Sequence, residues 1–166
     1  GAAGALAWLA IEWKLHRLPS VLGIISGAVT GLVAITPACA FVSPVGALVI
    51  GLVAGLACFF ASTSLRRRLG YDDALDVFGV HGIGGFVGIL GIGLLASANW
   101  GGTAGLMEGN GKLLGLQAMA CIIVTAWCAV ASYAILKVID LTIGLRVGKD
   151  VEIEGLDVRL HGEVVQ

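Results

Sequence analysis

Charged residues are scarce in this 166-residue chain, at 13% of the sequence against about 25% in soluble domains. The 10 Lys and Arg nearly balance the 11 Asp and Glu, and no basic stripe with interleaved aromatic residues is present. This composition excludes a nucleic-acid-binding protein. With 58% hydrophobic residues and a mean hydropathy of +0.98, it predicts an integral membrane protein instead.

Paired cysteines and the common catalytic motifs are also missing. The cysteines lie in apolar stretches without a CxxC pair, so we interpret them as free thiols and expect neither a metal site nor disulfides. The sequence contains no P-loop and no nucleophile elbow. We therefore expect a protein that is not an enzyme and that uses no cofactor.

Glycine and long apolar runs are abundant. The chain has 26 glycines, several at the small-xxx-small spacing of membrane helices that pack closely. Five membrane helices are predicted at residues 1–13, 21–39, 45–64, 72–98 and 113–139. The first is shorter than the roughly 20 residues that a spanning helix needs, so we expect a piece of a longer protein. The predicted fold class is an all-α polytopic membrane protein.

Basic residues gather in alternate connections between these helices. They occur in the first and third connections and after the fifth helix, at Lys14, Arg17, Arg66, Arg67, Arg68, Arg146, Lys149 and Arg159. The second connection has none, and the fourth has only Lys112. By the positive-inside rule the basic segments are cytoplasmic, including a polar tail that we expect to dock on the cytoplasmic face or a partner.

His81 is the main candidate functional residue. If the fourth helix begins at Asp72, nine residues at about 1.5 Å each place His81 about 14 Å deep, near the middle of a bilayer core about 30 Å thick. An ionisable residue at that depth usually faces a bundle interior or an aqueous pathway. The glycines at positions 84, 85 and 88 share its face and allow either close helix contact or a narrow lumen.

Polar residues at two helix ends are further candidates. Asp72, Asp73 and Asp76 lie where a helix N-terminus stabilises anions, and they follow the three arginines, so we expect capping and ion pairs. Pro37 predicts a kink or an end of the second helix near Thr36. The Thr36 hydroxyl then either bonds back to its own helix or lines a cavity.

The segment DDALDVFGVHGIGG, residues 72–85, resembles the second pore-histidine signature of the ammonium transporter family (Amt/Rh). Three further parts resemble family segments in the same order, namely residues 26–38, residues 140–147, and residues 154–157 with 161–163. The resemblance implies an eleven-helix trimer, each subunit with its own pore between two inverted five-helix repeats. This chain would hold the end of helix seven and helices eight to eleven.

The resemblance also implies a function and roles for single residues. On the matching positions, His81 is the second pore histidine, Val77 and Thr36 line the lumen, and Asp73, with Asp76 beside it, is structural below the pore. Ammonium or ammonia would pass through a hydrophobic pore, and it stays open whether methylammonium is accepted. The first pore histidine of the family belongs to earlier helices, so we expect conduction only together with the missing N-terminal half.

The same resemblance implies a protein of the cell membrane. Residues 1–147 would form its transmembrane domain, and residues 148–166 would form a regulatory tail in the cytoplasm. PII signal proteins are the implied partners at the cytoplasmic face. The end Val164-Val165-Gln166 departs from many relatives, which carry a tyrosine shortly after the glutamate at position 163.

Two alternatives remain open. The first is a sensor of the same fold, which binds ammonium and signals. The second is a membrane electron-transfer subunit with His81 as a haem ligand. A bis-histidine haem site would need a second buried histidine, whereas His16 and His161 lie in polar segments.

Overall fold

The computed structural model describes residues 1–163, which contain helices, connecting segments and one isolated β-bridge, but no strand. The departure from relatives at Val164, Val165 and Gln166 lies outside the described residues. Contacts divide the chain into two units, Gly1–Ile122 and Ile123–Gln166, and each unit is described by itself. The all-α class is thereby confirmed.

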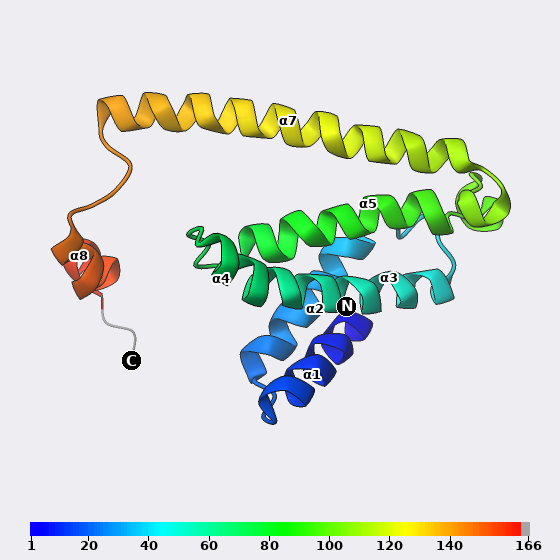
Figure 1. Ribbon diagram of the computed structural model, residues 1–166, viewed down its shortest axis with the longest axis horizontal. Helices are drawn as coiled ribbons and strands as arrows, with labels where there is room; N and C mark the ends of the chain where they lie inside the picture. Colours follow the sequence, from blue (N-terminus) through cyan, green and yellow to red (C-terminus); the bar gives the residue numbers. More distant parts are fainter. Residues whose placement is uncertain (164–166) are drawn as a thin grey trace. The chain divides into compact units, whose positions relative to one another are not determined.

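The first unit begins with α1 (Ala2–His16) and α2 (Val21–Ile35). Next come α3 (Pro44–Phe60), the π-helical η1 (Ala61–Leu65) and α4 (Arg66–Leu69), and then the π-helical η2 (Val77–Gly82), α5 (Ile83–Leu95) and the short α6 (Ala98–Gly101) and η3 (Leu106–Glu108). The long α7 (Gly111–Thr142) starts in this unit. Within the unit α1 lies beside α2, and α3 beside α5 (Figure 1), as the contacts between these helices require.

Within residues 1–163, three helical segments are long and apolar enough to cross a membrane: Pro44–Leu69, Val77–Leu95 and Gly111–Thr142. The helices α1 and α2 have 15 residues each, about 22 Å, which is less than a hydrocarbon core of about 30 Å. The structure thus supplies three of the five predicted spans at full length. Among the described residues it also contains a shorter apolar helix, Val21–Ile35, and the helix Ala2–His16, at the predicted places.

Serine caps and prolines set the helix boundaries where the sequence predicts them. The hydroxyl of Ser20 accepts a hydrogen bond from the Gly23 amide at 2.9 Å, and that of Ser43 accepts one from Gly46 at 3.1 Å. The helix α2 ends at Ile35, two residues before Pro37, which confirms the predicted break near Thr36.

Two predicted boundaries are wrong. The helix that starts at Pro44 continues past Ser64 through η1 and α4, so the three arginines lie on its last turn and not in a loop. The next helix begins at Val77, because Asp76 has a φ of 53°, in the left-handed region. His81 is therefore four residues, or about 6 Å, inside the helix, and the 14 Å estimate from Asp72 fails.

The first unit has two clusters of buried residues, of which one contains Trp8, Cys58, Phe59 and Val80 and the other is rich in alanine. Seven buried residues pack together at the end of the unit away from the arginines: Ala34, Ala38, Val42, Ile50, Ala54, Ile92 and Ala96. At the same end, Val42 forms the isolated β-bridge with Ala96, and the Ser97 amide donates to the Phe41 carbonyl at 2.9 Å. The connection after α2 is thus hydrogen-bonded to the connection after α5.

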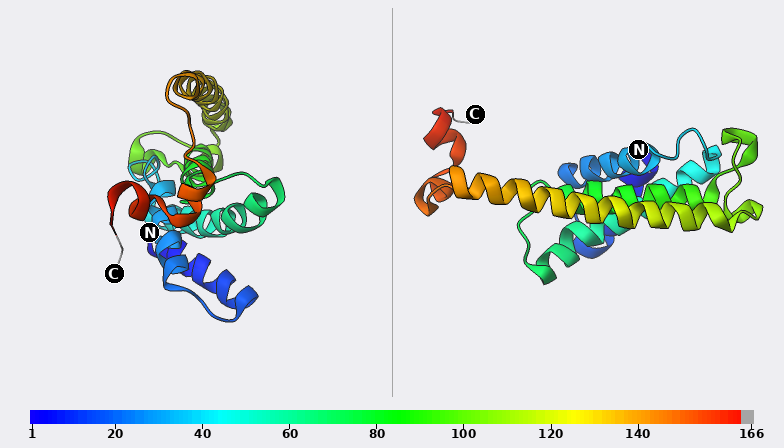
Figure 2. Two further views of the ribbon diagram at one scale, coloured as in Figure 1. Left: turned by 90° about the vertical axis from the view of Figure 1, so that its left-hand side faces the viewer. Right: turned by 90° about the horizontal axis from the view of Figure 1, so that it is seen from above.

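The second unit holds the rest of α7, α8 (Lys149–Glu154) and the π-helical η4 (Asp157–His161). Figure 2 shows α8 and η4 as two short helical turns that follow each other closely in the chain. Arg146 pairs with Glu152, and Arg159 pairs with Glu154. These ion pairs fold the tail locally, and the domain boundary at residue 147 stays a prediction.

Candidate functional site

A single carboxylate organises the start of the helix that contains His81. Asp73 accepts hydrogen bonds from the backbone amides of Val77 at 2.7 Å, Phe78 at 3.0 Å and Gly79 at 3.4 Å. These amides have no partner within the helix, and the positive end of the helix dipole favours a carboxylate there. The predicted capping is confirmed for Asp73.

Asp76 has a different partner. Its carboxylate forms an ion pair with the Arg66 guanidinium at 3.0 Å, with side chains 30% and 41% exposed. The pair connects the last turn of the Pro44–Leu69 helix to the residue before Val77. It confirms the predicted ion pairing and fixes the connection that precedes the His81 helix.

One face of the helix Val77–Leu95 packs closely against α2, α3 and η1. A Cβ on Gly79 would lie 2.3 Å from the Ser62 hydroxyl oxygen, and one on Gly88 would lie 2.2 Å from the Ala34 carbonyl oxygen. A Cβ on Gly84 would lie 3.3 Å from a methyl group of Val33, which is tight but is not an overlap. Glycine is therefore required at Gly79 and Gly88, where a Cβ would clash, and Gly84 is closely packed.

His81 lies on a face that this chain leaves open. Val77 is 55% exposed, His81 is exposed, and a Cβ on Gly85 would meet nothing within 4 Å. The imidazole of His81 forms no hydrogen bond with any residue in the described range 1–163. The sequence allowed either close helix contact or a narrow lumen at these glycines. Gly84 and Gly88 make close contact with other helices, whereas Gly85 faces open space.

Thr36 is exposed but is not beside His81. It directly precedes Pro37, which packs against Gly88, seven residues and about 10 Å along the helix from His81. The Thr36 hydroxyl donates to the Leu32 carbonyl at 2.7 Å, so it bonds back to its own helix. The structure thus places Val77 and His81 on successive turns and Thr36 at another level.

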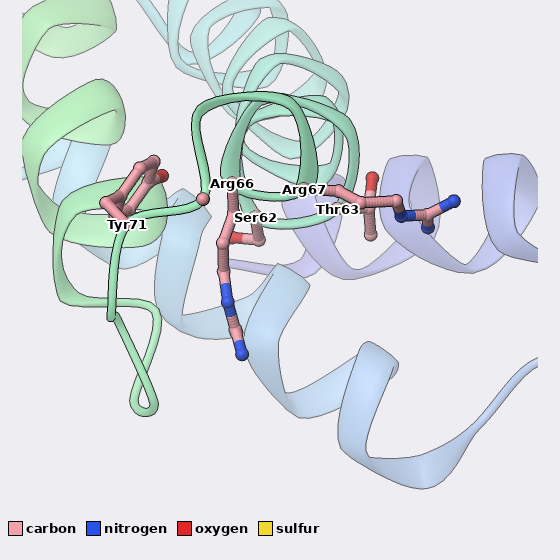
Figure 3. A pocket seen from close by; sticks show the side chains of 6 residues that line it. Ser62, Thr63, Arg66, Arg67 and Tyr71 are labelled. Carbon is pink, nitrogen blue, oxygen red and sulfur yellow. The ribbon is translucent and has the colours of Figure 1, made fainter.

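Sequence reasoning missed a polar cavity at the arginine-rich end of the first unit (Figure 3). The cavity has a volume of about 470 Å³ and is lined by Ser62, Thr63, Arg66, Arg67, Gly70 and Tyr71. It lies next to η1, where the helix widens to a π-helical turn, as helices often do at functional sites. The run of three arginines was the available signal, and nothing in the sequence indicated the π-helical turn.

The open face around His81 is suited to passing or binding a small polar species. A neutral imidazole can donate one hydrogen bond and accept another, and the imidazole of His81 has both functions unused within residues 1–163. The described residues contain no group of three or more His, Cys, Asp or Glu that could hold a metal ion.

Comparison with known proteins gives one consistent result. The profile of the Ammonium Transporter Family matches residues 1–166. The ammonium transporter of Bacillus subtilis is 42% identical over 98% of this chain and 41% of its own length. That of Aquifex aeolicus is 44% identical over 98% of this chain and 38% of its own length.

A solved structure shares the fold. The crystal structure of Saccharomyces cerevisiae Mep2 matches with a TM-score of 0.83 and 31% identity, over 90% of this chain and 35% of that one. The chain thus spans about two-fifths of the length of the curated relatives that it matches, at 41% and 38%. It belongs to the ammonium transporter family.

Proposed function

We propose that this chain forms the C-terminal part of a pore that carries ammonium or ammonia across the cell membrane. His81 and Val77 would line the pore on adjacent turns, and Thr36 would line it at another level. The chain would conduct only together with the remaining, N-terminal part of a family-length transporter. The observation that carries the proposal is the open face of Val77, His81 and Gly85.

The physical argument starts from the cost of exposing an imidazole to lipid. Ionisable groups within membrane helices face protein or a water-filled pathway, because hydrocarbon offers no hydrogen-bond partner. The opposite face of the same helix is already packed through its glycines. Covering the open face with a second set of helices would enclose a narrow channel, since Gly85 adds no side chain to it.

The residues below this face would hold its position. Asp73 caps the helix, and Asp76 ties its start to Arg66. In the proposal these carboxylates are structural and do not themselves carry the substrate.

The sidedness and the assembly follow as further parts of the proposal. The basic connections and the tail, residues 148–166, would be cytoplasmic, and residues 1–147 would form the transmembrane domain. The family resemblance adds a homotrimer with PII signal proteins at the cytoplasmic face.

Flux measurements in proteoliposomes test the function. Methylammonium and ammonium uptake would be measured for this chain alone and for this chain fused behind the N-terminal part of the B. subtilis transporter. We expect uptake by the fusion only, altered by His81→Ala and unchanged by His16→Ala. His16 offers a matched control, because it is an exposed histidine at the end of α1.

Two results would contradict the proposal. Uptake by the chain alone would show that the missing helices are dispensable. Equal flux in the fusion and in its His81→Ala variant would remove the histidine from the pathway.

A sensor is the second candidate, and one comparison favours it. A solved structure described as a sensor Amt protein matches with a TM-score of 0.83 and 28% identity, over 95% of this chain and 38% of that one. A sensor would bind ammonium at the same face without carrying it. A fusion that binds ammonium, but gives no flux above that of empty liposomes, would favour this candidate.

A further inference from the structure

Two hydroxyl groups that line the cavity at the arginine-rich end of the first unit have no hydrogen-bond acceptor or donor beside them in the described part of the chain. The hydroxyl oxygens of Ser62 and Tyr71 are buried and have no hydrogen-bond partner within residues 1–163. Ser62 as a whole is only 8% exposed. Buried hydroxyls without a partner are costly, so a ligand that satisfies both would be stabilised there.

The charge around the cavity determines the kind of ligand. Two of the lining residues are arginines and none is an acid. Arg66 donates to Asp76 through Nη1 and keeps its other donors, and Arg67 forms no ion pair with any residue in the range 1–163. An ammonium ion would be repelled here, whereas an oxyanion would accept from both guanidinium groups and both hydroxyls.

The walls of the cavity are fixed by contacts outside it. Tyr71 packs edge-on against Phe78, with ring centroids 5.7 Å apart, and Ser62 lies against Gly79 without space for a Cβ. The Thr63 hydroxyl donates to the Phe59 carbonyl at 2.7 Å and so is already used. In Figure 3, Ser62 lies between Tyr71 and Arg67. The Arg66 side chain extends past Ser62, and the exposed Arg67 side chain extends away from Tyr71, so both guanidinium groups must turn toward the hydroxyls to close on a ligand.

We propose that this cavity binds a phosphate group, held by Arg66, Arg67, Ser62 and Tyr71. Arginine forks match the geometry of phosphate oxygens, and the volume of about 470 Å³ accommodates the group with several waters. The phosphate comes either from a phospholipid headgroup or from free phosphate. Basic residues at the end of a membrane helix favour anionic headgroups, which would anchor the start of the His81 helix through the Arg66–Asp76 pair.

Binding measurements with single variants test the proposal. Purified chain in an uncharged detergent would be titrated calorimetrically with inorganic phosphate and, separately, with short-chain phosphatidylglycerol. Arg67→Gln should weaken binding about tenfold through the loss of a charge-assisted hydrogen bond. Ser62→Ala and Tyr71→Phe, which remove one oxygen and no charge, should each weaken it several-fold.

Arg68→Gln is the matched control. Arg68 is on the same short helix and carries the same charge, but it lines a neighbouring cavity with Ala57, Phe60 and Ile83. We expect its affinity to stay within twofold of the unchanged chain. Binding of phosphatidylglycerol alone would identify a headgroup site, and binding of both ligands would identify a general phosphate site.

Three results would overturn the proposal. The first is that neither ligand binds. The second is equal weakening by Arg67→Gln and Arg68→Gln, which would reduce the effect to general attraction by positive charge. The third is unchanged affinity in both Ser62→Ala and Tyr71→Phe.

Discussion

Asp73 holds three consecutive backbone amides, and this makes it the most consequential single residue at the start of the His81 helix. Asp73→Ala should lower the free energy of unfolding by about 1–2 kcal/mol, as the loss of a helix cap does. Asp73→Asn keeps one acceptor oxygen and should cost less. Thermal unfolding in detergent measures both changes, and equal losses in the two variants would contradict the capping role.

The carboxylate of Glu108 should make the connection between α5 and α7 sensitive to pH. Hydrogen bonds from Ser97 and from the Ala98 amide, the latter at 2.8 Å, hold the pKa of Glu108 below its usual value of 4.5. Because the folded pKa is depressed, this contribution to stability is complete above the unfolded pKa. It is lost as the pH falls through the folded value.

We therefore expect this connection to loosen only below about pH 4.5, with Glu108→Gln removing the transition. Trp100, which is 60% exposed in α6, reports the change by its fluorescence. The signal is isolated by subtracting the same titration of Trp100→Phe. A transition of equal size in Glu108→Gln would show that another group is responsible.

At the scale of helices, glycine decides which face packs. A Cβ on Gly88 would meet the Ala34 carbonyl, a backbone atom that cannot rotate away, whereas a Cβ on Gly85 would meet nothing within 4 Å. Gly88→Ala should destabilise the chain by about 1–3 kcal/mol, as overpacking does. Gly85→Ala, three residues away on the same helix, should leave thermal stability unchanged or slightly raised. Equal effects of the two changes would contradict the assigned faces.

The helix boundaries show which features the sequence could predict. Ser20, Ser43 and Pro37 act through local hydrogen bonds or missing donors, so the boundaries next to them were predicted correctly. Arg66, Arg67 and Arg68 were assigned to a loop because they are charged. Arginine is nevertheless a good helix former, and these residues continue the helix.

The candidate site was predictable only in part. The sequence indicated His81 as a candidate and predicted capping by Asp72, Asp73 and Asp76, without identifying Asp73 as the residue that caps the helix. The left-handed Asp76 and the π-helical segments η1 and η2 depend on tertiary contacts, such as Ser62 against Gly79, that leave no local signature. The sequence also could not separate Gly84 from Gly85, because the packing of neighbouring helices decides which of the two faces open space.

For the molecule as a whole, the distribution of basic residues predicts which connections share a side of the membrane. Leu69 and Thr103 are exposed and lie on either side of the apolar segment Val77–Leu95. In a background without native cysteines, Leu69→Cys should react with an impermeant maleimide only from the cytoplasmic side, and Thr103→Cys only from the other side. Asp150→Cys should behave like Leu69→Cys, and the opposite result would refute a cytoplasmic tail.

The tie between the two connections at the far end of α3 and α5 has a mechanical consequence. The bridge of Val42 with Ala96 and the hydrogen bond from Ser97 to Phe41 hold the start of α3 next to the end of α5, so this contact could act as a hinge. The opposite ends meet through wide π-helical turns and a half-exposed ion pair. A tilt of about 5° about the tie would leave the far end in place and displace His81, about 21 Å along the helix, by about 2 Å. In the proposed pore, a small change in helix angle would therefore change the width of the pathway at His81.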